Sequence, residues 1–254
     1  MNSVQVLYEN DELLVINKPS GLAVQGGQGI SHSLDKDFSL ELGYKIYLVH
    51  RLDKDTAGLM IVAKTPYAAA KWTKLIGSKE VRKEYVAVCC GSLVPQKGVI
   101  EDSVVQHGVT KKAKTFYSVE RKCEYDFCPD EEAGTDEKTG ANAKSNADSK
   151  SNTDAKTGSS EKSGSKIVLS WLRLKLETGR MHQIRIHLSK NGCPIAGDEQ
   201  HGNFKMNKLL RKKLGIKKLL LASVKLTLPL EGAQKSFEIE LPEYMASFDC
   251  TYKA

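Results

Sequence analysis

Two short polar stretches of the sequence carry residue types that could do chemistry, and each adjoins an apolar pattern. The first is His50-Arg51-Leu52-Asp53-Lys54-Asp55-Thr56, which precedes the apolar run Leu59-Met60-Ile61-Val62-Ala63. The second is Glu177–Leu188, which holds Arg180, His182, Gln183, Arg185 and His187. A charged turn that enters a buried strand is by default a solvated loop. Because a second dense polar cluster accompanies it, we interpret the first stretch, and Asp53 within it, as a candidate functional site and not as a solvated loop.

The first stretch begins like a calcium-binding loop but does not complete one. Asp53-x-Asp55-x-x-Gly58 fits positions 1, 3 and 6 of an EF-hand loop. The ligand positions 5 and 12 hold Ala57 and Lys64, so a cation replaces the bidentate carboxylate that closes such a loop. The spacing therefore excludes calcium.

The histidines give no metal site either. His182 and His187 are five residues apart, so they fall on opposite faces of a strand and well apart around a helix. The other histidines are interpreted as hydrogen-bonded structural residues: His32, His50, His107 and His201. The sequence has no phosphate-binding loop, dinucleotide fingerprint or serine nucleophile elbow. We therefore expect neither a metal nor a cofactor.

Composition indicates an ordinary folded protein with a basic surface. The 254 residues are 40% hydrophobic, enough for a sizeable core, and the N-terminal residues lack a signal-peptide pattern. No apolar run approaches the roughly 20 residues of a membrane span. The six cysteines form no CxxC pair, which favours a reduced, cytoplasmic protein with buried thiols. A formal charge of +7 favours an anionic partner, although this signal is weak alone.

The readable elements predict an α+β fold with a mainly antiparallel sheet and flanking helices. Thr65-Pro66 starts the clearest helix, with a capping residue and a proline at the first helical position, and Gly77 ends it. A second helix is expected to end near Asn191-Gly192, and alternation across Ile184 and Ile186 leaves a strand as the alternative. Alternating or apolar runs predict strands at 4–8, 13–17, 85–89, 114–120, 172–177, 220–228 and 236–241.

The segment 129–166 differs from the rest in composition. It contains no Val, Ile, Leu, Met, Phe, Tyr or Trp, so it cannot bury enough apolar surface to offset its ordering entropy. We expect a disordered insert at a hairpin tip, within one domain that spans residues 1–254. The chain carries +7 and the insert, with eight acidic residues and six lysines, carries −2. The remainder therefore carries +9.

Several motifs together resemble the RluA-type pseudouridine synthases. His50-Arg51-Leu52-Asp53-x-x-Thr56-x-Gly58 resembles the family signature, and Lys83-Glu84-Tyr85-Val86-Ala87 resembles its tyrosine motif. Thr178-Gly179-Arg180-x-His182-Gln183-Ile184-Arg185-x-His187 resembles its arginine motif, and Asn17-Lys18-Pro19-Ser20-Gly21 its N-terminal strand and loop. The motifs arrive in the family's order and cover most of the chain outside the insert. The chain departs from the family at Ala57, usually Ser, and at Leu221, usually His.

The resemblance implies an enzyme that isomerises uridine in structured RNA to pseudouridine. It implies the family's catalytic fold, with a central RNA-binding cleft and without the separate N-terminal RNA-binding domain (an S4 domain) of many members. The catalytic residues it implies are Asp53, Tyr85 and Arg180. Asp53 is the carboxylate beside the anomeric carbon, Arg180 pairs with it, and Tyr85 stacks on the flipped uracil. Arg51 fills the gap that the flipped nucleotide leaves.

RNA contacts are expected from the motifs and from one basic segment. The motif residues implied are His50, Arg51, Thr56, Lys83, His182, Gln183 and Arg185. The segment Phe204–Leu219, helical in its first part, holds seven cations and no acid; Lys205, Lys208, Arg211 and Lys212 are its main candidates. A solvated helix face is the alternative for this segment.

Ribosomal RNA is the favoured substrate and transfer RNA stays open. We expect a monomer that binds RNA, needs no protein partner and contacts no membrane. The main alternative is a noncatalytic RNA-binding or RNA-folding factor on the same scaffold. A hydrolase that releases the base would use the same carboxylate, and the residues alone do not exclude it.

Overall fold

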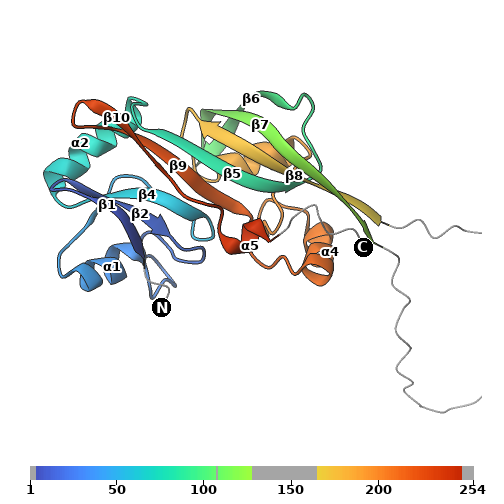
Figure 1. The fold of residues 1–254 in the computed structure, drawn as a ribbon, viewed down its shortest axis with the longest axis horizontal. Coiled ribbons are helices and arrows are strands. Elements are labelled where there is room, and N and C mark those ends of the chain that lie inside the picture. The colour runs from blue at the N-terminus through green and yellow to red at the C-terminus, as the bar shows by residue number, and fades with distance from the viewer. Residues whose placement is uncertain (1–3, 107, 128–164, 248–254) are drawn as a thin grey trace, which may run out of the picture.

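The computed structural model describes residues 4–106, 108–127 and 165–247, and its strands form one ten-stranded sheet (Figure 1). The strands are β1 Gln5–Glu9, β2 Leu13–Lys18, β3 Tyr47–Leu48, β4 Ala57–Ala63, β5 Arg82–Cys90, β6 Lys97–Gln106, β7 Val109–Phe127, β8 Ser165–Leu176, β9 Leu221–Leu230 and β10 Ala233–Glu238. Their main order is β1-β2-β4-β9-β5-β8-β7-β6, with β3 on β4 and β10 on β9.

Among the described strands, β4 and β9 form the one parallel pair, so the prediction of an α+β fold with a mainly antiparallel sheet is confirmed. The parallel pair brings two backbones very close at Gly58. Its φ is 109°, and a Cβ there would lie 2.1 Å from the carbonyl oxygen of Ser223. Only glycine fits this position, directly after the Asp53 loop.

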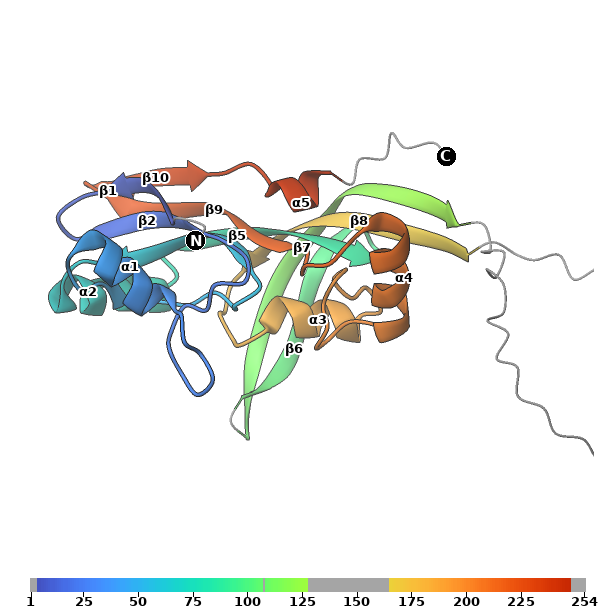
Figure 2. The same cartoon turned by 90° about the horizontal axis from the view of Figure 1, so that it is seen from below.

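Five helices lie at the two ends of the sheet and near its middle: α1 Leu34–Leu42, α2 Pro66–Gly77, α3 Gln183–Lys190, α4 Phe204–Leu214 and α5 Glu243–Ala246. The first two lie at one end and α3 and α4 at the other (Figures 1 and 2). The predicted start of α2 is confirmed, because Thr65 Oγ1 accepts a hydrogen bond from the N–H of Ala68 and Pro66 is the first helical residue.

Side chains that alternate along the central strands divide the core into two clusters. Leu14 and Ile16 of β2 face one cluster, which includes residues of α1, α3 and α4. Leu13 and Val15 face the other, which includes Trp72 of α2. All seven residues of β4 are buried, so the apolar run after the Asp53 loop is a strand covered on both faces. Such a strand gives the loop a rigid support.

The predicted strand at 236–241 is displaced toward the N-terminus. Glu231 and Gly232 both have positive φ, of 52° and 79°, and they form the two-residue turn between β9 and β10. A turn of this kind restarts pairing at once, so β10 begins at Ala233.

The strands β7 and β8 form the hairpin that holds the insert. They pair antiparallel from Thr115 and Leu176 to Phe127 and Ser165. The expected disordered insert lies outside the described residues except at its end, where Ser165 and Lys166 belong to β8 and correct its predicted boundary. The β6–β7 hairpin projects from the body of the molecule in Figure 2.

The cysteines follow the prediction in part. Cys89, Cys90 and Cys193 are buried free thiols. Cys123, on β7, is buried as well, and Cys128 and Cys250 lie outside the described residues. No described helix combines the length and apolar character needed to cross a bilayer.

Candidate active site

The loop that carries Asp53 is fixed from beneath by a buried lysine. Lys18, at the end of β2, is fully buried, and its Nζ donates to the carbonyl oxygens of Pro19 (2.9 Å), Leu22 (2.9 Å) and Lys54 (3.0 Å). Burial lowers the pKa of Lys18 to about 7, against the opposing effect of Asp55 and Asp53. Three carbonyl acceptors match the three N–H groups of an ammonium.

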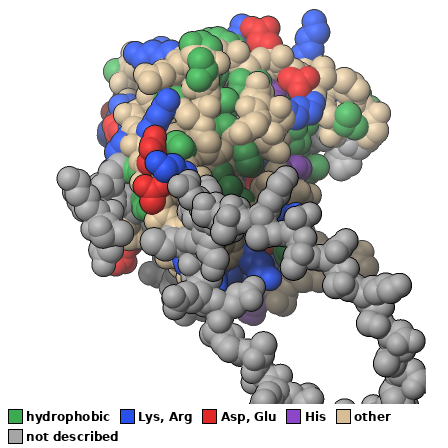
Figure 3. All heavy atoms as spheres, turned by 90° about the vertical axis from the view of Figure 1, so that its right-hand side faces the viewer, with side chains coloured by type: hydrophobic (Ala, Val, Ile, Leu, Met, Phe, Trp, Pro, Cys, Tyr) green, Lys and Arg blue, Asp and Glu red, His purple; other side chains and the backbone are tan. Residues whose placement is uncertain are grey.

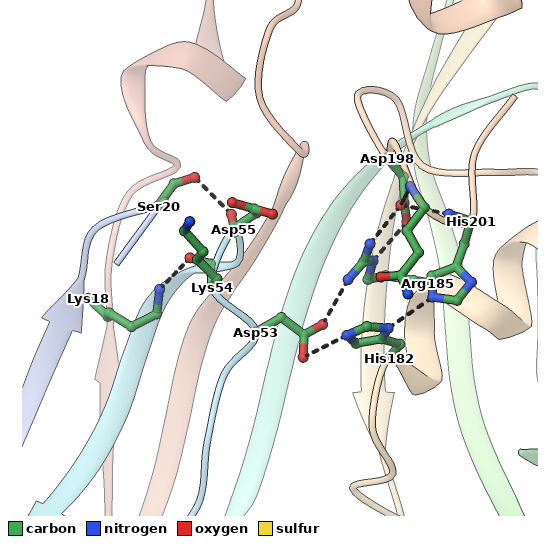
Figure 4. Close-up of polar contacts among 10 residues, drawn as sticks. Lys18, Ser20, Asp53, Lys54, Asp55, His182, Arg185, Asp198 and His201 are labelled. Carbon is green, nitrogen blue, oxygen red and sulfur yellow. Dashed lines mark hydrogen bonds and ion pairs between the residues drawn. The ribbon is translucent and has the colours of Figure 1, made fainter. Parts of the chain in front are cut away.

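Two further bonds join the same segments. Ser20 Oγ donates to the carbonyl oxygen of Asp55 at 2.8 Å (Figure 4), and the N–H of Gly21 donates to the carbonyl oxygen of Lys54 at 2.9 Å. The residues just after β2 thereby hold the backbone of the Asp53 loop in place. This is the local reason why the Lys18-Pro19-Ser20-Gly21 motif accompanies the Asp53 motif.

Arg185, on α3, is the cation that faces Asp53. Its Nη1 lies 3.4 Å from Asp53 Oδ2. Its Nε and Nη2 donate to the two carboxylate oxygens of Asp198, at 2.8 and 2.7 Å. Burial opposes the charge of Arg185, but the bonds to Asp198 and Asp53 raise its pKa, and in return Arg185 lowers the pKa of buried Asp198.

The expected pairing of Arg180 with Asp53 was therefore wrong. Arg180 lies before α3, where its Nε donates to the carbonyl oxygen of Lys112 at 3.4 Å and its side chain lines a cavity. The two arginines belong to one motif, but α3 begins at Gln183, which turns Arg185 toward Asp53. The expectation that Arg185 contacts RNA is replaced by this buried role, because its guanidinium is occupied by two carboxylates.

Two histidines complete a ring of side chains around Asp53. His182 Nε2 lies 3.7 Å from Asp53 Oδ1, and its Nδ1 lies 2.9 Å from His201 Nε2 (Figure 4). The backbone N–H of His201 donates to Asp198 Oδ1 at 2.9 Å. These contacts close a ring of five residues: Asp53, His182, His201, Asp198 and Arg185. His182 has a φ of 53°, a left-handed conformation at the N-cap of α3.

The turn that carries Asp198 is held by α4. Buried Asn207 donates from Nδ2 to the carbonyl oxygen of Asp198 at 2.8 Å and accepts at Oδ1 from the N–H of Gly197 at 3.1 Å. Gly197 has a φ of 77°, and a Cβ there would meet the carbonyl oxygen of Lys218 at 2.0 Å. Asp198 was not predicted as a site residue, and neither was its contact with Asn207. The only sequence signal was the position of Asp198 just after the arginine motif.

Asp53 lies where two cavities meet. The larger, of about 1050 Å³, is lined by Asp53, Lys83, Tyr85, Arg180 and His182 among others. Burial raises the pKa of Tyr85, so its hydroxyl keeps its proton, and burial lowers the pKa of Lys83. The motif residues Tyr85 and Lys83 thus share this cavity with the Asp53 carboxylate and come from β5, which β9 separates from β4 in the sheet.

The smaller cavity, of about 480 Å³, is strongly charged. It shares Arg51, Asp53, His182 and Arg185 with the larger one. Its other cationic lining residues are Lys54, Arg211, Lys217 and Lys218. Exposed Arg51 thus stands at the junction of both cavities, next to Asp53.

Three residues expected to contact RNA have their polar atoms engaged or enclosed within the protein. His50 Nε2 accepts from the N–H of Ile61, and burial lowers the pKa of His50 to about 3. Thr56 is buried, and its N–H donates to the carbonyl oxygen of Asp53. These contacts give His50 and Thr56 a structural role in the loop. For His50 this agrees with the interpretation as a hydrogen-bonded structural residue.

The amide of Gln183 is fully occupied. Its Oε1 accepts from Thr178 Oγ1 (2.7 Å) and from the N–H of Arg180 (3.1 Å). Its Nε2 donates to the carbonyl oxygen of Lys114 and to Thr115 Oγ1, both at 3.0 Å. Gln183 therefore ties the start of α3 to β7, and this leaves no amide position for the RNA contact that was expected.

The basic residues of α4 lie on an exposed helix, as expected. Arg211 pairs with Glu199 at 2.7 Å at the rim of the smaller cavity, and Lys205, Lys208 and Lys212 are exposed. On this end of the molecule Lys and Arg side chains are dispersed among acidic and hydrophobic ones (Figure 3). Within the described ranges, no three His, Cys, Asp or Glu side chains are grouped so as to hold a metal ion.

Comparisons with known proteins agree with this geometry. A family model described as RNA pseudouridylate synthase matches residues 12–190. Ribosomal large subunit pseudouridine synthase C of Rickettsia felis is 32% identical over 202 residues, which cover 78% of this chain and 56% of that protein. Ribosomal large subunit pseudouridine synthase D of Yersinia pestis is 28% identical over 267 residues, which cover 99% of this chain and 71% of that protein. The chain thus spans just over half to about seven-tenths of the length of these relatives.

Solved structures show the same fold. Human RNA Pseudouridylate Synthase Domain Containing 4 superposes with a TM-score of 0.65 at 23% identity, over 95% of this chain and 90% of that one. Human RNA Pseudouridylate Synthase Domain Containing 1 gives a TM-score of 0.63 at 18% identity, over 94% and 83%. The resemblance inferred from the motifs is confirmed.

Proposed function

Because this chain belongs to the RNA pseudouridylate synthase family, we propose that it isomerises uridine to pseudouridine within RNA. The N1–C1′ bond of the target uridine breaks, the uracil turns, and C5 bonds to C1′. The hydrogen on C5 leaves as a proton and N1 regains one, so the change is an isomerisation. The single observation that carries the proposal is the Asp53 carboxylate, 21% exposed, held by Arg185 at the junction of two cavities.

Asp53 is the catalytic carboxylate in this proposal. Cleavage of a glycosidic bond leaves positive charge at C1′, and a carboxylate beside that carbon either attacks it or stabilises the charge. Arg185 lies 3.4 Å from one of the oxygens of Asp53 and places a positive charge beside it. The uridine must leave its stack to reach the carboxylate, at a cost of a few kcal/mol. Its base enters the larger cavity beside Tyr85, which is 5% exposed and keeps its phenolic proton.

Three arginine and lysine positions suit contacts to the RNA. Arg51, exposed at the junction, fills the space left by the flipped nucleotide. Arg180 and Lys83 line the larger cavity and bind the phosphates that flank the target. The cations of α4 and of Lys217-Lys218 extend this contact past the smaller cavity.

The substrate in this proposal is ribosomal RNA. The two relatives described above are named for the large ribosomal subunit, which favours its RNA over transfer RNA. The chain acts as a monomer in the cytoplasm, on RNA alone.

The test is tritium release from RNA labelled at uracil C5, because forming the C5–C1′ bond expels that hydrogen. Wild-type protein and Asp53→Asn would be incubated separately with ribosomal and transfer RNA pools. Asn keeps the size of the side chain and removes the charge. We expect release from ribosomal RNA by the wild type and a loss of at least about 1000-fold in the variant.

Two other outcomes would overturn the proposal. Binding of RNA without release by the wild type would indicate a noncatalytic RNA-binding factor. Free uracil in the supernatant, without tritium release, would indicate hydrolysis of the glycosidic bond.

A further inference from the structure

We propose that His201 is a positioning residue that fixes the tautomer of His182, so that His182 presents an N–H group to the Asp53 carboxylate. The inference deepens the proposed function and rests on it, because it assigns a role to a side chain that does not touch the reacting atoms. His201 follows His182 by nineteen residues and comes from the turn between Asp198 and α4.

The geometry places His182 between an anion and a second imidazole. Its Nε2 faces Asp53 Oδ1 at 3.7 Å, and its Nδ1 faces His201 Nε2 at 2.9 Å, with the two rings edge to face at 75° (Figure 4). Both ring nitrogens of His182 therefore have one defined neighbour each.

A neutral imidazole has one N–H and one lone pair, so its two neighbours cannot be treated alike. A lone pair at Nε2 would point at a carboxylate, which is repulsive. The favourable arrangement puts the hydrogen on Nε2 and the lone pair on Nδ1. Since Nδ1 then accepts, His201 must donate its Nε2–H across the 2.9 Å contact.

His201 is held in place beside His182 by its backbone. Its backbone N–H is bound to Asp198 Oδ1 at 2.9 Å, and Asp198 is itself clamped by Arg185 from α3 and by Asn207 from α4. The position of His201 therefore depends on the same Asp198 turn that holds the guanidinium of Arg185. Both supports of Asp53 are connected through this one turn.

The charged groups around His182 come from three elements. Asp53 and Arg51 lie on the loop before β4, Arg185 lies on α3, and Asp198 lies on the turn before α4. Burial lowers the pKa of His182. The negative charges of Asp53 and Asp198 oppose this shift, and the positive charges of Arg185 and Arg51 add to it. Burial and Arg185 likewise lower the pKa of His201. The pair is thus neutral at neutral pH, as the tautomer argument requires.

A neutral donor has a specific use beside Asp53. Arg185 faces Oδ2 at 3.4 Å and His182 faces Oδ1 at 3.7 Å, so the two side chains together favour one rotation of the carboxylate. A second cation at Oδ1 would also weaken the carboxylate as a nucleophile or charge stabiliser. His182 in the Nε2–H form orients Asp53 without adding charge.

The experiment compares His201→Gln with His201→Phe. Gln keeps an N–H donor near the position of Nε2 and cannot titrate, whereas Phe keeps the ring and removes the donor. Imidazole ¹⁵N shifts of His182, assigned with His182→Gln, report which nitrogen carries the hydrogen. We expect the Nε2–H form in the wild type and in His201→Gln, and a mixture of both tautomers in His201→Phe.

Tritium release should follow the same order. We expect kcat to fall about tenfold in His201→Phe with KM for RNA unchanged, and to stay within about threefold in His201→Gln. The Nε2–H form persisting in His201→Phe would overturn the proposal. Equal loss of kcat in both folded variants would also overturn it.

The ¹⁵N measurement separates the two proposals. If the wild type releases no tritium while the tautomer changes as expected, the proposed function fails and the relation between His201 and His182 stands. If the wild type is active and the tautomer does not respond, the relation fails alone.

Discussion

The two sides of Asp53 are held by different kinds of contact. On the side of β2, Lys18, Ser20 and Gly21 bind backbone carbonyl oxygens and fix where the loop runs. On the side of α3, Arg185 and His182 face the carboxylate itself, at 3.4 and 3.7 Å. Contacts to backbone set the position of Asp53, and contacts to its side chain set the rotation of its carboxylate. Substitutions on the two sides should therefore be separable by measurement.

Arg185→Met should give the largest effect, because it breaks the side-chain support of Asp53 and leaves Asp198 charged and 1% exposed. Loss of one partner of a buried ion pair costs about 3–5 kcal/mol in the free energy of unfolding. Urea unfolding at pH 7 measures this. Arg180→Met removes a half-buried arginine of the same motif, whose Nε makes a single long bond to the carbonyl oxygen of Lys112, and its free energy of unfolding should change by less than about 1 kcal/mol. Equal losses in the two variants would contradict the assignment of Arg185 as the internal cation.

Lys18→Met should destabilise the backbone side by about 1–3 kcal/mol, because three carbonyl oxygens lose their donor. Methionine retains the apolar stem, so little packing is lost. The neighbouring exposed Lys54→Met is the matched control and should unfold within about 0.5 kcal/mol of the wild type. Stability of Lys18→Met equal to that of the control would show that the loop does not depend on this anchor.

His50→Gln should sharpen the comparison through pH, with the smallest effect at neutrality. Burial lowers the pKa of His50 to about 3, below its usual 6.5, so only the unfolded chain takes up a proton between these values. The wild type should therefore lose about 1.4 kcal/mol of stability for each pH unit below 6, relative to the variant. Gln keeps an acceptor for the N–H of Ile61. Parallel urea curves at pH 7.5 and 5, with exposed His32→Gln as the control, measure the difference; identical pH slopes for wild type and His50→Gln would contradict it.

The helices and strands around Asp53 were predictable where a single local signal determines the type or the start of an element. The capping Thr65 and Pro66 define the start of α2, and the unbroken apolar run after the loop could only be a buried strand. The alternating run before Glu177 gave β8, since half-buried strands repeat every two residues. The order of the family motifs along the chain predicted the fold.

The site itself was predictable in its carboxylate but not in its partners. Arg180 and Arg185 are equivalent by spacing alone, and only the residue at which α3 begins decides which one faces Asp53. His201 and Asp198 reach Asp53 through the turn that Asn207 and Gly197 hold, a contact between segments that no local pattern encodes. Lys18 was visible as a motif residue, but a lysine at a strand end usually keeps its ammonium in water.

The long β7–β8 hairpin has a consequence for how this chain can change. Its end nearest the Asp53 loop, at Thr115 and Leu176, is fixed by Gln183, whereas Phe127 and Ser165 form the last described pair at its other end. Residues added beyond that pair follow a part of the hairpin that contacts none of the residues around Asp53. The hairpin therefore separates a part of the protein that can acquire new sequence freely from a part that must be kept, and it is the natural point at which to attach a label or a second protein.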